Sequence, residues 1–290
     1  MSENKNRQDE FRYRYPHKVY GSLPGVHYGK SLGTGDSFAG FANLFDYPDP
    51  RRLDLRASIR DNMSTGREGY LVRRYQQRSP INLWLLADLS KSMAMSNVDH
   101  EQLANLAQLV AHSATSYGDN FGMAGFDSVV RHDVHVMPTR QRSISHIAAD
   151  MIRDAEPAAE AGVEGLIHAA NMITSSSAIV FLASDFCCDI EEVDRTLRQL
   201  SRYIVVPVVW KHDDVNHLPS HAGWTEMRDS ETGERRSVWM RPSIKKRWEE
   251  TMNSHFEQLT ECFMRHRVRP LFTDGNVTGE QLTNYFLGRN

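Results

Sequence analysis

The chain has 290 residues, with 34 Lys and Arg against 37 Asp and Glu and a hydrophobic content of 40%. This length and apolar content are typical of one large or two modest folded domains and exclude a disordered chain. No apolar run approaches the ~20 residues of a membrane span, and the polar N-terminus lacks the apolar segment of a secretory signal. The net charge of −3 gives none of the basic footprint of a nucleic-acid binder. We therefore expect a cytoplasmic protein with no membrane span and no nucleic-acid partner.

The charge is divided unevenly along the chain. Residues 1–80 hold 14 basic and 9 acidic side chains, a net charge of +5, which leaves −8 for residues 81–290. The first segment is rich in Gly, Tyr and Pro and has no long apolar run. This predicts a basic family preamble over 1–80, β-rich or irregular, that packs on a main domain over 81–290. Because opposite charges attract, the acidic domain is expected to bind its own preamble or a basic partner.

From residue 81 onward, short apolar runs alternate with amphipathic stretches. The apolar runs predict strands over residues 81–88, 121–126, 129–137, 178–183, 203–210 and 269–272. Apolar residues at helical spacing predict helices over residues 98–116, 143–153, 164–173, 190–201, 243–266 and 279–287. Residues 224–240 predict an inserted β-hairpin. This order of elements predicts an α/β fold with a doubly wound, mostly parallel sheet. Pro207 is unusual within its strand, because proline favours an edge or a bulge.

The cysteines and histidines carry no metal motif. Three cysteines, Cys187, Cys188 and Cys262, are too few for a disulfide framework and lack the paired spacing of a zinc site. We interpret Cys187 and Cys188 as small apolar residues at a strand end rather than as a redox pair. The 13 histidines are interpreted as scattered surface residues.

The informative site follows the first strand of the main domain. Asp88, Ser90 and Ser92 form an Asp-x-Ser-x-Ser loop at its carboxyl end, where ligands bind in open α/β sheets. A second buried strand ends in Ser184 and Asp185 and presents another carboxylate at the same edge. One carboxylate and two hydroxyls form a hard-oxygen cluster suited to Mg²⁺, Mn²⁺ or Ca²⁺. The alternative is that the two serines only cap the following turn.

These motifs resemble the metal-ion-dependent adhesion site (MIDAS) of von Willebrand factor A domains. The resemblance implies that Asp88, Ser90 and Ser92 contact the metal, that Asp185 binds behind them or through water, and that a partner's acidic group completes the coordination. The resemblance extends over nearly the whole chain to one bacterial branch, the family of unknown function numbered fifty-eight, which is found with MoxR-type AAA+ ATPases. The segments that carry it outside the site are residues 33–38, 47–60, 72–75 and 228–234.

The sequence departs from that family at the third hydroxyl ligand. The family places a threonine in a Gly-Gly-Thr loop, and the corresponding position here is Val163. A methyl group does not coordinate a metal, so metal affinity is expected to be weakened or lost. Ser37 and Leu55 also replace an expected glutamate and tryptophan.

The leading hypothesis is a non-enzymatic adaptor for a MoxR-type ATPase. It would assist the chaperone-like maturation of a client complex, or insert metal or cofactor into it, with the methanol-oxidation (MxaS-like) branch and methanol dehydrogenase as the narrower identification. One alternative is a Mg²⁺-dependent phosphohydrolase of the haloacid dehalogenase type, with Asp88 as nucleophile and Lys211 and Asp213-Asp214 as later elements. That chemistry needs an acid two residues after the nucleophile, where this chain has Ser90. The other alternative is a metal-free scaffold.

Overall fold

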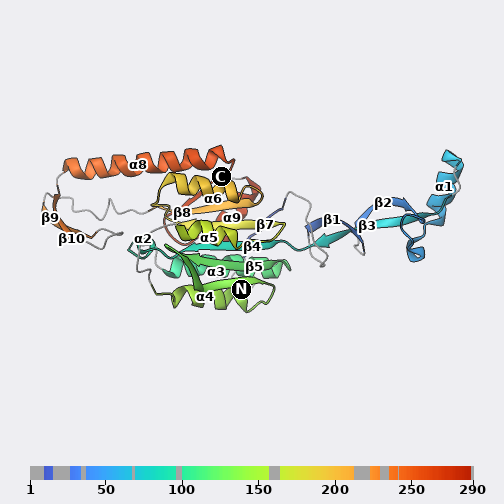
Figure 1. Cartoon of the computed structure of the whole chain (residues 1–290), viewed down its shortest axis with the longest axis horizontal. Helices are drawn as coiled ribbons and strands as arrows, with labels where there is room; N and C mark the ends of the chain where they lie inside the picture. The colour runs from blue at the N-terminus through green and yellow to red at the C-terminus, as the bar shows by residue number, and fades with distance from the viewer. Residues whose placement is uncertain are drawn as a thin grey trace, which may run out of the picture. The chain divides into compact units, whose positions relative to one another are not determined.

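The computed structural model describes residues 10–15, 27–33, 37–66, 69–95, 100–156, 164–211, 223–228, 235–240 and 242–288. These residues form two compact units. The smaller unit comprises residues 15–81, and the larger unit comprises the rest of the chain (Figure 1). Each unit is treated separately below.

The larger unit is built on a six-stranded sheet with the strand order β11-β8-β7-β4-β5-β6. Its strands are β4 (Asn82–Asp88), β5 (Asn120–Phe126), β6 (Val130–Thr139), β7 (Ala178–Ser184), β8 (Ile204–Trp210) and β11 (Leu271–Thr273). Five of them pair in parallel, and β6 alone pairs antiparallel, with β5. The sheet is therefore mostly parallel and doubly wound, as in von Willebrand A and other Rossmann-like folds, and the predicted fold class is confirmed.

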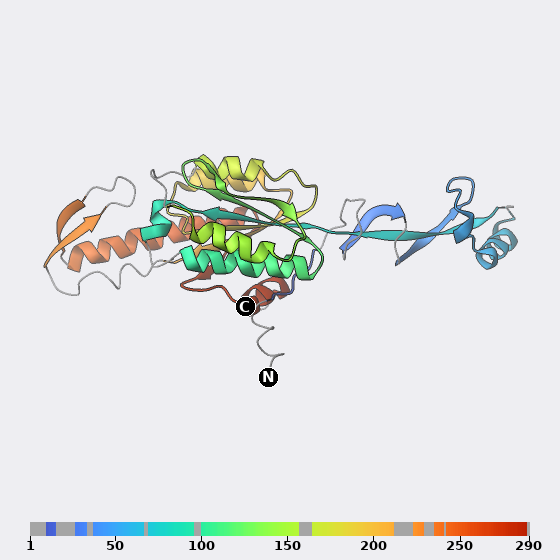
Figure 2. The ribbon, with the colours of Figure 1, turned by 90° about the horizontal axis from the view of Figure 1, so that it is seen from below.

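Helices cover both faces of this sheet (Figure 1). They are α2 (Lys91–Met95), α3 (His100–Ser116), α4 (Ile144–Arg153), α5 (Glu164–Asn171), α6 (Ile190–Gln199), α8 (Pro242–Arg265) and α9 (Gly279–Leu287). One layer contains α5, α6 and α8, and α3 and α4 pack together on the other side, as Figure 2 also shows. Side chains alternate along each strand, so Trp84 and Leu86 of β4 join the core under α5, α6 and α8, whereas Leu83 and Leu85 are buried on the other face.

The predicted strands and helices correspond closely to these elements, with two informative details. The predicted helix over 98–116 begins at His100, and a separate short helix, α2, precedes it. Pro207 lies within β8, and β11 pairs with β8 only from Val208 onward. Among the described strands, the first half of β8 therefore pairs on one side only, with β7. Proline is tolerated there because that stretch lies at the edge of the sheet.

The predicted hairpin consists of β9 (Gly223–Arg228) and β10 (Arg235–Met240). The two strands pair antiparallel, with Trp224 opposite Trp239. The turn predicted at 229–233 lies outside the described residues.

The N-terminal boundary differs from the prediction. Residues 10–14, expected in the preamble, belong to the larger unit. The Phe11 side chain is fully buried, and its ring stacks on that of Phe286 in α9. The Phe11 N–H donates to Ser113 Oγ at 3.1 Å, and the Tyr13 hydroxyl donates to Asp119 Oδ2 at 2.6 Å. The Phe11 ring thus anchors this segment to the larger unit. The amino-acid composition of residues 1–80, on which the predicted boundary was based, does not reveal this contact.

The smaller unit is a three-stranded antiparallel sheet in the order β1-β3-β2. Its elements are β1 (His27–Gly33), β2 (Ser37–Asn43), the short 3-10 helix η1 (Pro50–Arg52), α1 (Leu55–Thr65) and β3 (Leu71–Ser79). Across the part of the chain that is described, no helix combines the length and apolar character needed to cross a membrane.

Candidate functional site

The two predicted strand-end carboxylates meet at the carboxyl edge of the six-stranded sheet. β4 ends at Asp88 and β7 ends at Ser184, and the two strands are parallel neighbours. The Ser184 hydroxyl donates to Asp88 Oδ2 at 2.6 Å. The exposed fractions of Asp88 and Asp185 are only 1% and 2%. The edge therefore holds two acidic groups that are almost removed from water.

The loop after β4 adds two hydroxyls to this cluster. The Ser90 N–H donates to Asp88 Oδ1 at 2.8 Å, which fixes the carboxylate against the start of the loop. The Ser90 and Ser92 hydroxyl oxygens are 2.9 Å apart. The Leu89 N–H donates to the Phe126 carbonyl at 2.8 Å, which ties the loop to the end of β5. One carboxylate and two hydroxyls consequently form a compact set of oxygen donors.

The charge at this point is unfavourable without a counterion. Burial and the neighbouring Asp185 charge raise the pKa of Asp88 to about 7 from its ordinary value of 3.8. Hydrogen bonds from Ser184 and Ser90 lower the pKa but do not offset these two effects. A bound cation would favour the ionised carboxylate and would replace the missing solvation.

The donor set fits a hard divalent cation. Carboxylate and hydroxyl oxygens are ligands suited to Mg²⁺, Mn²⁺ and Ca²⁺, and Asp88, Ser90 and Ser92 offer them together. The Asp185 charge acts on Asp88 from nearby. Val163, at the family's threonine position, lies outside the described residues.

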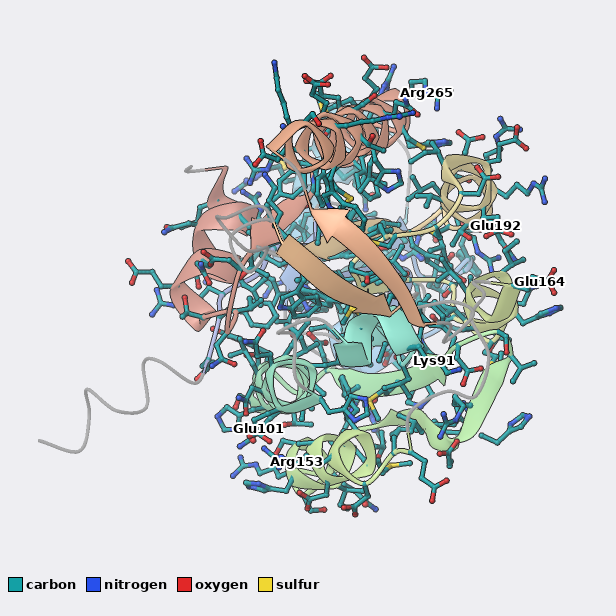
Figure 3. The ribbon with its side chains drawn as sticks, turned by 90° about the vertical axis from the view of Figure 1, so that its left-hand side faces the viewer. Lys91, Glu101, Arg153, Glu164, Glu192 and Arg265 are labelled. Atoms are coloured by element: carbon teal, nitrogen blue, oxygen red, sulfur yellow. The ribbon has the colours of Figure 1, made fainter. Side chains whose placement is uncertain are left out.

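Further carboxylates form an acidic rim, which we define as Glu164, Asp189 and Glu192. Glu164 is the exposed first residue of α5, and Asp189 is the N-cap of α6. Partial burial, and then the charges of Asp189 and Glu164, raise the pKa of Glu192. Figure 3 shows Glu164 and Glu192 on neighbouring helices, with Lys91 of α2 closer to the centre of the view. The rim adds a negative potential that attracts cations.

The cysteine pair follows the second strand end. Burial, followed by the charges of Asp88 and Asp185, raises the pKa of the Cys188 thiol, so this thiol stays neutral. Cys188 packs partly against the core, in keeping with its apolar interpretation. Cys187 is exposed, and its N–H donates to Asp185 Oδ1 at 3.0 Å. The prediction of an apolar role is therefore wrong for Cys187, whose contribution is a backbone hydrogen bond.

The backbone after β7 is held in a strained conformation. Phe186 has φ of 53°, in the left-handed region that bulky residues rarely adopt. Its N–H donates to Ser184 Oγ at 2.8 Å, and its carbonyl lies 2.8 Å from His255 Nε2. Its buried ring packs edge-on against Phe263. These contacts hold the turn that directly follows Asp185.

A third strand-end acid, Asp127, was not predicted as a site residue. It follows β5 and is buried, and its Oδ1 accepts the Val129 N–H at 2.9 Å. The Arg131 guanidinium pairs with its Oδ2 at 3.2 Å. The signal that was available is an acid directly after an apolar strand, but its arginine partner indicates a structural role for Asp127.

A second unpredicted cluster joins α6 to α8. Asp194 Oδ1 lies 2.8 Å from His266 Nε2 and 3.9 Å from Cys262 Sγ. Asp194 Oδ2 lies 2.5 Å from Arg198, and Arg265 is also within 3.9 Å of Asp194. The hydrogen bond with His266, and then the charges of Arg198 and Arg265, lower the pKa of Asp194. With two arginines already facing this carboxylate, we interpret the cluster as an ion-pair network that holds the two helices together.

Sequence comparison identifies the family. Residues 49–258 match the profile of "Protein of unknown function DUF58". The chain belongs to this family. A comparison with curated proteins finds no match.

Three solved structures are similar to this DUF58 chain. The first is BatB, a conserved hypothetical protein from Bacteroides thetaiotaomicron, with 10% identity and a TM-score of 0.39 over 70% of this chain and 94% of that one. The second is an aerotolerance-related membrane protein from Bacteroides fragilis, with 10% identity and a TM-score of 0.42 over 72% of this chain and 98% of that one. The third is the pilus adhesin SpaC from Lactobacillus rhamnosus GG, with 11% identity and a TM-score of 0.40 over 72% of this chain and 30% of that one.

Proposed function

We propose that this DUF58 protein is a non-enzymatic interaction protein that captures a carboxylate of its partner at the Asp88 site. The supporting observation is the buried Asp88–Asp185 pair beside two serine hydroxyls 2.9 Å apart. Asp88, Ser90 and Ser92 would hold Mg²⁺, or Mn²⁺ or Ca²⁺, with Asp185 behind them. The ion, when bound, supplies an open coordination position for an acidic side chain of the partner.

The chain's own groups prepare this site. The Ser184 hydroxyl and the Ser90 N–H hold the two oxygens of Asp88 in fixed directions. The acidic rim raises the local concentration of cations. It also repels an acidic partner until the ion is in place, so the proposed capture depends on the metal.

In the cell, the proposed role is that of a cytoplasmic adaptor for a MoxR-type AAA+ ATPase. The client would be a complex that needs maturation or metal or cofactor insertion, such as methanol dehydrogenase. The resemblance of the motifs to the MoxR-associated family supports the choice of partner.

Calorimetric titration with Mg²⁺, Mn²⁺ and Ca²⁺ tests the metal site. We expect one bound ion per chain in the wild type and none in Asp88→Asn, which keeps the size of the side chain. The double variant Ser90→Ala/Ser92→Ala is expected to weaken binding, whereas the exposed Ser201→Ala serves as a matched control. Absence of heat and of any shift in melting temperature in the wild type would favour a metal-free scaffold.

Binding to a purified MoxR-type ATPase from the same organism tests the partner. The expected complex forms with Mg²⁺ and is lost with EDTA or with Asp88→Asn. A complex that persists under both conditions would contradict capture through the metal. Mg²⁺-dependent turnover of an aryl phosphate that Asp88→Asn abolishes would instead support the phosphohydrolase.

A further inference from the structure

Helix α1 of the smaller unit is attached to its sheet through its polar face. Asp54 caps its first turn. One turn later, Ser58 Oγ accepts the Leu71 N–H at 2.8 Å, and after one more turn Asn62 Oδ1 accepts the Gly69 N–H at 3.1 Å. Ser58 is buried. Residues 54, 58 and 62 therefore form the inward face of the helix.

The next row around α1, about 100° from this inward face, is apolar and exposed. Leu55, Ile59 and Met63 follow one another at intervals of one turn, and their exposed fractions are 57%, 59% and 83%. We call these three residues the α1 stripe. A surface helix ordinarily turns such a row toward the core, so this inverted arrangement leaves an apolar seam available for a partner.

Two arginines flank the stripe. Arg56 directly follows Leu55, Arg60 directly follows Ile59, and both are exposed. Within the described ranges, neither guanidinium forms an ion pair. The complementary surface is thus an apolar groove with carboxylates along one side.

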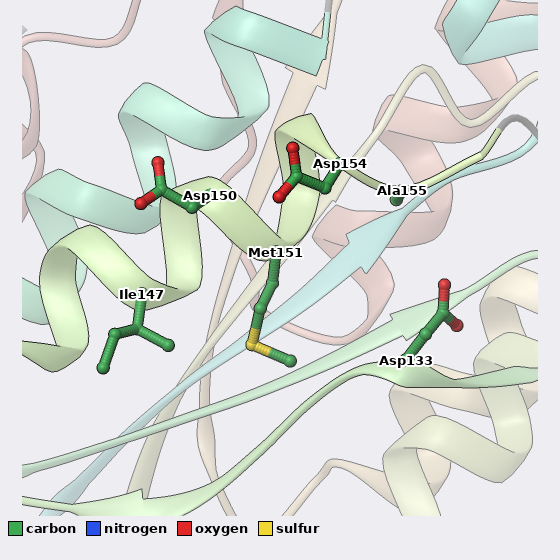
Figure 4. A pocket seen from close by; sticks show the side chains of 6 residues that line it. All are labelled: Asp133, Ile147, Asp150, Met151, Asp154 and Ala155. Carbon is green, nitrogen blue, oxygen red and sulfur yellow. The ribbon is translucent and has the colours of Figure 1, made fainter.

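The larger unit presents such a surface between α4 and β6. A hollow of about 360 Å³ is lined by Asp133, Ile147, Asp150, Met151, Asp154 and Ala155. We call it the α4 hollow. Ile147 and Met151 lie one turn apart on α4 and form its apolar floor, whereas Asp150 and Asp154 lie along α4 and Asp133 lies across the hollow on β6 (Figure 4).

Negative charge predominates around the α4 hollow. Arg131 and Arg153 pair with carboxylates there. Arg131 is shared between Asp127 and Asp133, and Arg153 is shared between Glu101 and Asp150. Asp154, which also lines the hollow, forms no ion pair with the described residues. Each guanidinium therefore faces two carboxylates, and negative charge is in excess.

The two surfaces match in spacing as well as in sign. On α1 each arginine directly follows a stripe residue, whereas on α4 Asp150 directly precedes Met151 and Asp154 lies one turn further on. When two parallel helices contact each other through one row of residues each, the residues that directly follow the contact row in one helix lie on the same side of the interface as those that directly precede it in the other. A parallel pairing would therefore bring Arg56 and Arg60 alongside Asp150 and Asp154 while the apolar rows face each other.

We propose that the α1 stripe of one copy of this chain docks on the α4 hollow of a second copy. The docking is independent of the metal site. A two-fold dimer in which each copy contributes both surfaces would use the contact twice. A lipid surface fits less well, because interfacial helices present a broad apolar face rather than a single row of three side chains.

Sedimentation velocity of the full chain between about 1 and 200 µM tests the proposal, in EDTA so that the metal site takes no part. We expect reversible self-association with a Kd on the order of 10 µM, given the small contact. Ile59→Asp is expected to weaken it at least ~10-fold by placing a charge in the seam. Met264→Asp, which alters an exposed methionine of α8 (62% exposed), is the matched control and should leave association unchanged.

Charge reversal identifies the two surfaces. Arg56→Glu/Arg60→Glu and Asp150→Arg/Asp154→Arg should each abolish association alone, because each variant then carries like charges on both surfaces. An equimolar mixture should associate again, because every contact in a mixed pair joins opposite charges. Circular dichroism melts of each variant check that the fold is kept.

Four outcomes would overturn the proposal. One is a wild type that stays monomeric over the whole range. Another is association that Ile59→Asp does not weaken, or a mixture that remains monomeric although both variants fold. The last is Ile59-dependent flotation of a monomeric wild type with anionic vesicles, which would assign the stripe to lipid.

Discussion

Replacing Asp88 by asparagine should stabilise the larger unit at pH 8 when no divalent cation is present. The folded state raises the pKa of Asp88 to about 7 from 3.8, so between these values the folded chain keeps a proton that the unfolded chain has lost. Below about pH 4 the carboxyl is neutral in both states and the free energy of unfolding is at its full value. As the pH rises from about 4 to about 7, that free energy falls, because only the unfolded state loses the proton. Above pH 7 the ionised group destabilises the fold, and asparagine removes that effect.

The magnitude follows from the pKa difference. At about 1.4 kcal/mol for each pH unit, a carboxyl whose pKa rises from 3.8 to about 7 destabilises the fold by about 4 kcal/mol above pH 7. Asparagine offers one acceptor oxygen where the carboxylate accepts from both Ser90 and Ser184, which forfeits about 1 kcal/mol. The expected net gain for Asp88→Asn is about 3 kcal/mol at pH 8, and it should disappear near pH 4.

Urea unfolding followed by the fluorescence of the buried Trp84 and Trp210 reports on this unit. Measurements at pH 4, 6 and 8 in EDTA give the pH profile, and the exposed Asp274→Asn provides a control for the loss of one charge. Mg²⁺ at pH 8 should raise the midpoint for the wild type and leave that of Asp88→Asn unchanged. A variant that is destabilised equally at pH 4 and pH 8 would refute the argument from burial and repulsion.

Four further substitutions, at three positions, test the packing and the charge pairing of the larger unit. Gly165→Ala should destabilise the larger unit by about 3 kcal/mol in the same assay, because a Cβ there would lie 2.4 Å from the carbonyl oxygens of Asp127 and Val129; a neutral effect would contradict that close approach. Phe186→Ala should cost about 4 kcal/mol through lost packing, and Phe186→Gly should be the less harmful of the two by about 1 kcal/mol, since its positive φ suits glycine; the opposite order would show that the backbone is unstrained. Asp194→Asn should lose stability at pH 7 and approach the wild type below about pH 4, because the lowered pKa of Asp194 contributes stability that is lost as the pH falls; a difference that is independent of pH would argue against the ion-pair network.

Apolar runs and capping residues were sufficient to predict the order of strands and helices in the larger unit. The five residues before Asp88 are all apolar and therefore form a strand buried on both faces. Thr278 and Gln281 form a capping box, and α9 begins and ends as its sequence predicts. The Asp-x-Ser-x-Ser loop could also be placed at a strand end, because its position depends only on where the apolar run stops.

Contacts between distant segments could not be predicted in this way. The burial of Phe11 against α9 depends on a partner that lies far along the chain. The pairing of Arg131 with Asp127 separates a structural acid from the candidate ligands, and a list of strand-end acids does not contain that information.

The sequence by itself determined that this chain has strands and helices in α/β order and an oxygen-rich loop after the first strand of the main domain. Periodicity and turn chemistry decide those features within a few residues of each position. Only the tertiary structure decided that β7 lies beside β4, so that Asp185 stands against Asp88 in a buried place and changes its pKa. It alone decided, too, that α1 turns Ser58 inward and Ile59 outward. Burial and the interaction of charges are set by which segments become neighbours, and the order of residues along the chain does not specify that directly.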